Sequence, residues 1–249
     1  HPIVTIERHT SFVRSLFGKR RAGLERRPPV PFFTVNYDTL LEDALALCRV
    51  QSTDGFSGGA MAFWDPDGAN TGFDDPFLTA GGCQARVFKL HGSIDWFMSG
   101  VDAVVRRREG AGYPPDEPGR LLIYPQATKY QATQKDPFAR LFAAFRAALN
   151  AERQSVLAIC GYSFSDEHVN EEIERALRRR GNQLTVLAFV HEPDSGPAGA
   201  ALPAALSGWL ATSDDWRERV IVAGSRAGYH GSTKPLSPLP AGESHPWWS

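Results

Sequence analysis

Short apolar, β-prone runs alternate along this chain with segments that carry apolar residues at helical spacing. The run Phe32–Val35 passes directly into a helical pattern at Asp38–Cys48, and the run Ser155–Cys160 passes into another that starts near Ser165. Such alternation is typical of right-handed β-α-β units. We therefore predict an α/β fold, a Rossmann-like, doubly wound and mainly parallel sheet of about six strands with helices on both faces.

The remaining segments complete this prediction. Further strands are expected at residues 86–90, 121–124, 184–190 and 219–223, and further helices at residues 10–21 and 136–149. We interpret residues 54–82 as a long loop and residues 99–120 as a solvated excursion, because both are rich in turn formers and lack periodicity. Ser155–Cys160 is continuously apolar, which predicts a central strand buried on both faces. Ser165 is expected to cap the helix that follows it.

Composition limits the function classes. The chain has 249 residues, of which 42% are hydrophobic, enough for one domain core, and we place a domain at residues 1–224 and a Gly/Ser/Pro-rich tail at residues 225–249. A formal net charge of -1 gives no direct signal for nucleic acid, and the Arg runs at 106–108 and 178–180 are interpreted as solvated faces. No apolar run is long enough to span a membrane. Three cysteines without close spacing (Cys48, Cys83 and Cys160) favour a reduced, cytoplasmic protein.

Polar clusters follow three of the predicted strands. Asn36 and Asp38 end the first, His91 ends the second, and a Gly-x-Ser turn at Gly161–Ser163 ends the run before the second helix. In an open parallel sheet these ends line one crevice, where ligands bind. Each residue taken singly is more often a cap, a turn former or a structural histidine. Their joint position favours a nucleotide site with a built-in base.

Four ordered phrases then point to a family: FTVNYDTLLEDAL, KLHGSIDW, IYPQATKY and ICGYSFSDEHVNEEI. They resemble the successive motifs of the sirtuin-like domains of bacterial antiphage-defence proteins, which hydrolyse NAD, and the likeness runs from about Phe12 to about Val190. The resemblance implies that Asn36 contacts the nicotinamide ribose or a reactive water and that Asp38 holds the carboxamide. It makes His91 the base.

The same resemblance implies a wider binding set. It assigns Gly161 and Ser163 to the ribose and phosphate, and we add Thr34 and Gly92 from the same phrases. NAD is then the substrate, and no metal is expected, because the paired Cys-x-x-Cys of a zinc module is absent from the sequence. That absence favours plain hydrolysis over protein deacylation. The family's N-terminal strand and Gly-rich pyrophosphate turn are also missing, so we expect the sequence to be incomplete at its front.

The predicted function is an NAD+ glycohydrolase that releases nicotinamide and ADP-ribose and depletes NAD in antiphage defence by abortive infection. The resemblance implies a homo-oligomer with an activating partner, such as a HerA-type DNA translocase or an Argonaute-type protein. Two alternatives stay open. Ser163 follows a strand as a serine-hydrolase nucleophile does, although Ser165 stands where that motif has Gly. The second alternative is a non-catalytic nucleotide-binding module that serves in assembly.

Overall fold

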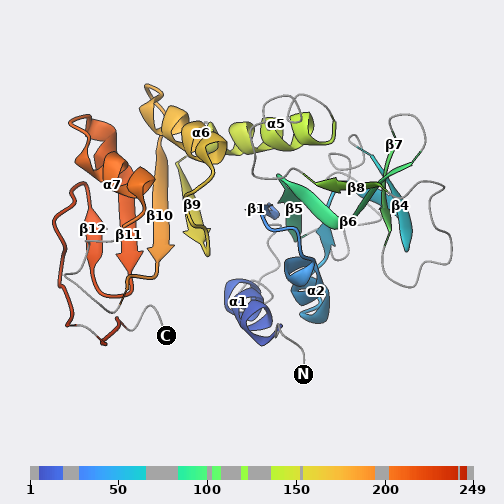
Figure 1. Cartoon of the computed structure of the whole chain (residues 1–249), viewed down its shortest axis with the longest axis horizontal. Helices are drawn as coiled ribbons and strands as arrows, with labels where there is room; N and C mark the ends of the chain where they lie inside the picture. The colour runs from blue at the N-terminus through green and yellow to red at the C-terminus, as the bar shows by residue number, and fades with distance from the viewer. Residues whose placement is uncertain are drawn as a thin grey trace. The chain divides into compact units, whose positions relative to one another are not determined.

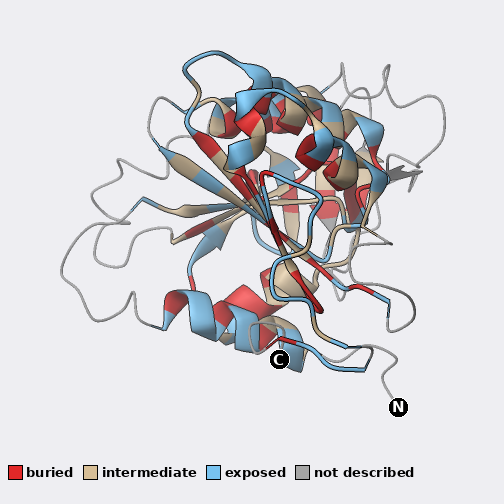
Figure 2. Ribbon diagram, turned by 90° about the vertical axis from the view of Figure 1, so that its left-hand side faces the viewer, coloured by how far each residue is buried: buried red, intermediate tan, exposed pale blue. Residues whose placement is uncertain are grey.

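The chain forms two compact units, residues 1–143 and residues 144–249 (Figure 1). A computed structural model describes residues 6–18, 28–65, 84–99, 103–107, 119–122, 136–151, 154–193, 202–240 and 242–245. Buried positions concentrate along the strands and on the inner sides of the helices (Figure 2).

The first unit contains a small parallel sheet. Its strands are β1 (Val30–Thr34), β5 (Ala85–Lys89) and β2 (Ser52–Thr53), in the order β1-β5-β2. Helices α1 (Glu7–Phe17) and α2 (Leu40–Leu47) lie side by side (Figure 1). They form one apolar core with β5, made of Val13, Phe17, Ala44, Leu45, Val50, Ala85 and Val87.

Burial alternates along β5, and this alternation decides where its last residue lies. Ala85, Val87 and Lys89 are buried, while Arg86 and Phe88 between them are partly exposed. Successive side chains of a strand point to opposite faces, so Lys89 shares the face of the two apolar residues that pack against the helices. On the other face Phe88 stacks on Phe33 of β1, with ring centroids 4.8 Å apart.

A second, antiparallel sheet completes the first unit. It has the order β3-β4-β7-β6-β8, and its strands are β3 (Phe56–Gly58), β4 (Met61–Trp64), β7 (Ala103–Arg107), β6 (Gly92–Ser99) and β8 (Gly119–Leu122). An aromatic cluster of Phe56, Trp64 and Trp96 lies within it.

This sheet corrects two predictions. The segments interpreted as a long loop and a solvated excursion supply β3, β4, β7 and part of β8, although residues 66–83 and 108–118 lie outside the described residues. Arg106 is wrongly predicted as solvated: it is 7% exposed and pairs with Asp54. A buried guanidinium needs such a partner because desolvation of a lone charge is costly. Arg178, Arg179 and Arg180 are exposed, as expected.

The second unit is built on a four-stranded sheet. Strands β9 (Ser155–Cys160), β10 (Leu184–Val190) and β11 (Val220–Gly224) run parallel, and β12 (Gly228–His230) pairs antiparallel with β11. The helices of this part are α6 (Glu167–Arg178), α7 (Ala204–Ala211) and the short 3-10 helix η2 (Asp215–Arg219). Helix α5 (Phe138–Leu149) spans the boundary between the units.

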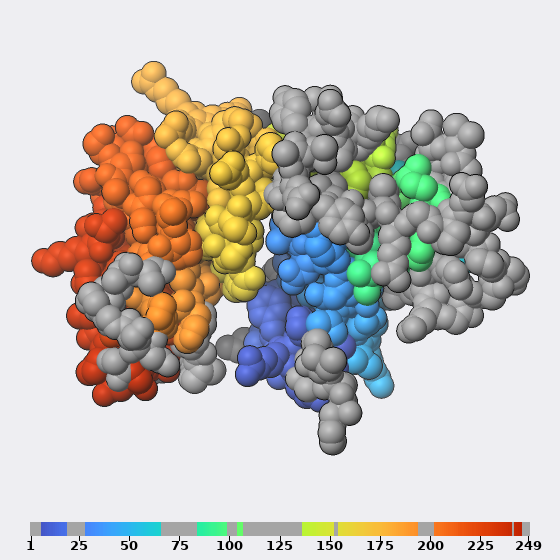
Figure 3. All heavy atoms as spheres, in the orientation of Figure 1, coloured from blue at the N-terminus to red at the C-terminus, as the bar shows by residue number. Residues whose placement is uncertain are grey.

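The fold prediction therefore holds only in its coarse form. The chain is mixed α/β, but its parallel strands belong to two sheets and not to one of six strands. Burial in β10 alternates between buried and half-buried positions, which indicates one well-covered face. Strand β9 does not match the prediction of a central strand within the described residues: it is the last strand in the order β12-β11-β10-β9, and Val156 is 62% exposed. The yellow atoms in Figure 3 belong to the part of the chain that runs from β9 toward α6.

Part of the segment that we expected to be a tail forms a strand. β12 begins at Gly228, within residues 225–249, and Tyr229 in this strand is buried. Among the described residues, no helix combines the length and apolar character needed to cross a bilayer.

Candidate functional site

Two turns at the ends of neighbouring parallel strands carry most of the predicted site. β1 and β5 are in register up to Thr34 opposite Lys89, so the segments that follow them emerge at the same sheet edge. Backbone hydrogen bonds join the two turns: Leu90 N donates to Thr34 O (2.9 Å), and Ile94 N donates to Tyr37 O (2.9 Å). The Ser93 hydroxyl also donates to Tyr37 O (3.2 Å). These bonds fix the backbone around Asn36 against the backbone around His91.

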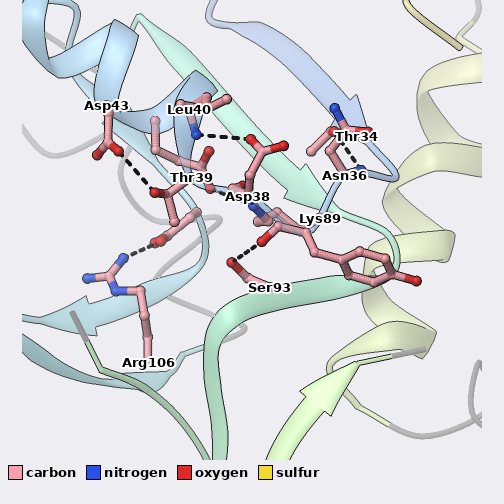
Figure 4. A network of polar contacts seen from close by, with 12 residues as sticks. Thr34, Asn36, Asp38, Thr39, Leu40, Asp43, Lys89, Ser93 and Arg106 are labelled. Carbon is pink, nitrogen blue, oxygen red and sulfur yellow. Dashed lines mark hydrogen bonds and ion pairs between the residues drawn. The ribbon is translucent and has the colours of Figure 1, made fainter. Parts of the chain in front are cut away.

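The first turn is shaped by side chains that bond to nearby backbone (Figure 4). Asn36 N donates to Thr34 Oγ1 (3.0 Å), and Leu40 N donates to Asp38 Oδ1 (3.1 Å). The Thr39 hydroxyl donates to Asp43 Oδ2 (2.9 Å) within the first turn of α2. Thr34 and Asp38 therefore stabilise the turn by accepting hydrogen bonds from its backbone, as Ser, Thr and Asx residues do beside helix starts. This structural role does not depend on a ligand. The Asn36 side chain is exposed.

His91 lies where β5 ends and β6 begins. The residue is 8% exposed, and its ring lies 6.3 Å from the Tyr37 ring, centroid to centroid. The next residue, Gly92, has φ +85°, a left-handed conformation that glycine adopts without strain. This glycine lets the chain leave the parallel sheet and enter the antiparallel one directly after the histidine.

Lys89 and Glu42 form a buried ion pair beneath these turns, and sequence analysis missed both. Lys89 is 1% exposed and Glu42 is 8% exposed, with Lys89 Nζ 3.2 Å from Glu42 Oε1. The ammonium also donates to the backbone carbonyl of Asp38. Burial raises the pKa of the Glu42 carboxyl, the charge of Asp95 adds to that rise, and Lys89 opposes it. The available signal was the apolar alternation of β5, because a lysine on a buried face requires a partner.

The third predicted turn lies in the second unit. Gly161 has φ +66°, and apart from its two chain neighbours no atom of the described residues lies within 4 Å of the place where a Cβ would stand. The hydroxyls of Ser163 and Ser165 are 2.8 Å apart, and both residues are exposed. Asp166, and not Ser165 as predicted, caps α6: its Oδ1 accepts from His168 N (3.0 Å) and Val169 N (3.2 Å). These amides are thus already bonded to a carboxylate, which a phosphate would have to replace.

The structure thus groups the predicted residues in two sets. Thr34, Asn36, Asp38, His91 and Gly92 gather at one sheet edge of the first unit, whereas Gly161 and Ser163 occupy a turn of the second unit. Within the described residues no cluster of His, Cys, Asp and Glu side chains is arranged to hold a metal ion.

Comparison with known proteins identifies the family. A family model described as "SIR2-like domain" matches residues 30–211, which is most of the chain, and the chain belongs to this family. The resemblance expected from the four phrases is confirmed at this level. The SIR2-like domain implies a sirtuin-type, NAD-related fold. A search of curated proteins found no match.

Proposed function

We propose that this protein is an NAD+ glycohydrolase that cleaves the bond between nicotinamide and ribose and releases nicotinamide and ADP-ribose. One observation carries the proposal: the backbone segments bearing Asn36 and His91 are hydrogen-bonded to each other at one sheet edge. Membership of the SIR2-like family supports NAD as the substrate.

The chemistry needs few groups. Nicotinamide leaves from a cationic pyridinium as a neutral molecule, so no general acid is required, and the transition state resembles an oxocarbenium ion. The protein must supply a base and must position water. We assign the base to the His91 imidazole, since histidine commonly accepts protons near neutral pH. We assign the positioning of water or a ribose hydroxyl to Asn36, whose carboxamide both donates and accepts hydrogen bonds.

The remaining residues are assigned to binding. Asp38 Oδ1 accepts a hydrogen bond from the Leu40 backbone amide. We propose that Asp38 Oδ2 accepts a hydrogen bond from the carboxamide of nicotinamide. Thr34 and Gly92 shape the turns around Asn36 and His91. Open space at the Cβ position of Gly161 supports a close approach of a ligand to that backbone, and the exposed Ser163 hydroxyl can bond to ribose or phosphate.

Chromatography of NAD incubated with the full-length protein tests the proposal. Wild type is expected to release nicotinamide, and His91→Ala is expected to lower turnover by roughly 100-fold or more, since a general base contributes at least that much. Asn36→Ala is expected to reduce turnover strongly as well. His230→Ala is the matched control, because this exposed histidine bonds to Glu218 O in the second unit and has no assigned role.

Two results would contradict the proposal. Absence of nicotinamide release by wild type would favour a non-catalytic nucleotide-binding module instead, especially if NAD still bound. Equal turnover by wild type, His91→Ala and Asn36→Ala would remove the roles assigned to those residues. Circular dichroism of each variant shows whether a loss of turnover reflects a loss of fold.

The serine-hydrolase alternative receives little support. A serine nucleophile needs a base within hydrogen-bond reach, and the described hydroxyl partner of Ser163 is Ser165. Labelling with a fluorophosphonate probe would detect such a nucleophile directly.

The biological role is a further part of the proposal. The resemblance of the four phrases to antiphage-defence domains supports NAD depletion in the cytoplasm during phage infection, by an oligomer with an activating partner of the HerA or Argonaute type. Measurement of cellular NAD and phage plaque counts with wild type and His91→Ala, each with and without a candidate partner, tests it. NAD loss that is equal for both forms would exclude it.

A further inference from the structure

Lys89 connects the elements that carry the candidate catalytic residues. It ends β5, two positions before His91, and its face of the strand is the one covered by the helices. Its ammonium reaches the Asp38 carbonyl in the turn that also holds Asn36, and it pairs with Glu42 in the first turn of α2. One side chain thus contacts the backbone of one turn while its own backbone leads into the other.

The pair is an inefficient way to stabilise a core. Replacing a buried ion pair with apolar residues of similar size is often neutral or stabilising, because the charges lose their hydration. Glu42 illustrates this cost: its Oε2 is buried without a hydrogen-bond partner among the described residues, and burial raises the pKa of its carboxyl. An apolar side chain at position 89 would fill the space. It would leave the Asp38 carbonyl without this donor.

We propose that Lys89 and Glu42 are positioning residues for the proposed reaction. Glu42 holds the Lys89 ammonium in place, and the ammonium fixes the Asp38 carbonyl and hence the Asn36–Asp38 turn relative to His91. This inference rests on the proposed NAD hydrolysis. Neither residue needs to touch the substrate, because a displacement of about 1 Å in a reacting group can lower turnover by about 100-fold.

A double variant separates positioning from stability. Lys89→Met alone leaves the Glu42 charge buried and unpaired, so we expect both lower stability and lower turnover. Lys89→Met with Glu42→Leu removes both charges and is expected to recover most of the stability. Its turnover is expected to stay roughly 10- to 100-fold below wild type, because the Asp38 carbonyl still lacks its donor.

The chain provides a matched control in the same unit. Arg106 and Asp54 also form a buried ion pair, with side chains 9% and 11% exposed, and neither contacts the two turns through a described hydrogen bond. The double variant Arg106→Met with Asp54→Leu is expected to keep near wild-type turnover when folded. Equal losses in the two double variants would show a general effect of pair removal and would overturn the positioning role.

A second readout does not depend on activity. In NMR spectra of the Lys89→Met, Glu42→Leu variant, we expect the Asn36 amide signals to shift while signals of the second unit stay in place. Wild-type turnover by the variant, or unchanged Asn36 signals, would overturn the inference. Absence of turnover in wild type itself would refute the proposed function, and the Asn36 signals would still test whether the ion pair fixes the turn.

Discussion

Two buried carboxylates, one in each unit, are held in contrasting ways. Glu192 in the second unit is 2% exposed and uses both oxygens: Oε1 accepts from the Tyr229 hydroxyl (2.7 Å), and Oε2 accepts from Arg226 N (2.8 Å) and Ala227 N (2.9 Å). Glu42 in the first unit uses Oε1 for Lys89, and its Oε2 is buried without a hydrogen-bond partner among the described residues.

The difference separates a structural carboxylate from a positioning one. Glu192 fixes the connection between β11 and β12, and Gly224 must lack a side chain because a Cβ there would overlap the carboxylate. Both carboxylate oxygens and the three donors that face them are paired, which is how a buried charge stabilises a fold. Glu42 lies beneath the candidate active site, and only one of its two carboxylate oxygens has a described hydrogen-bond partner. We explain this arrangement by the role of Lys89, which Glu42 holds against the Asp38 carbonyl.

The largest predicted effect is that of Glu192→Gln. The amide that replaces one oxygen is a donor and would face the Tyr229 hydroxyl or the two backbone amides, so at least one buried donor loses its acceptor. We expect the free energy of unfolding to fall by about 3 kcal/mol. Urea denaturation measures it, with the exposed Glu171→Gln as control. A loss equal to that of the control would show that the Glu192 contacts carry little stability.

Tyr229→Phe should have the next largest effect. Burial and the bond to Glu192 raise the pKa of the Tyr229 hydroxyl, which therefore stays a donor. Its removal leaves Glu192 Oε1 without that bond but keeps the packing of the ring, so we expect a loss of about 1.5 kcal/mol. A double-mutant cycle with Glu192→Gln should show strong coupling. Additive losses would mean that the two residues act independently.

The sequence predicted the elements that depend on local patterns, but not the contacts of the two buried carboxylates. Local patterns located these elements correctly. Strand β9 has the predicted bounds Ser155–Cys160, and the helical pattern expected to start near Ser165 forms α6, whose buried residues Val169, Ile173, Ala176 and Leu177 follow helical spacing. The apolar runs also located the ends of β1 and β5 to within one residue, and therefore the turns that carry Asn36 and His91.

Pairings between distant segments could not be predicted in this way. The antiparallel sheet contains strands as short as Phe56–Gly58, which lies in a glycine-containing segment that we predicted to be a loop. Such short strands are stabilised by pairing with strands far along the chain, which local sequence does not reveal. The same holds for Glu192 with Tyr229 and for Lys89 with Glu42, because a single charged residue gives no local sign of its partner. β9 was predicted as central because apolar runs look alike at the centre and at the edge of a sheet.

Glu42→Gln should affect stability less than Glu192→Gln does. The amide oxygen can still accept from Lys89, and the new amide group replaces Oε2, which has no described donor to lose. We expect the free energy of unfolding in urea denaturation to change by no more than about 1 kcal/mol, because removal of a buried charge offsets the weaker pairing with the ammonium. A loss as large as that of Glu192→Gln would show that the Glu42 charge is essential to the fold and would end the contrast.

The smallest effect is a pH dependence that belongs to Glu42 alone. Because its folded-state pKa is raised above 4.5, chiefly by burial, the folded protein binds a proton there more readily than the unfolded chain does. Its contribution to stability is therefore fully present below the unfolded pKa and is lost as the pH rises through the folded pKa. The stability difference between wild type and Glu42→Gln, measured from neutral pH downward, should shift in favour of wild type as the pH falls toward 4.5. A shift in the opposite direction would mean that pairing with Lys89 outweighs burial. Glu42 would then be a stabilising charge like Glu192, and the contrast between the two units would disappear.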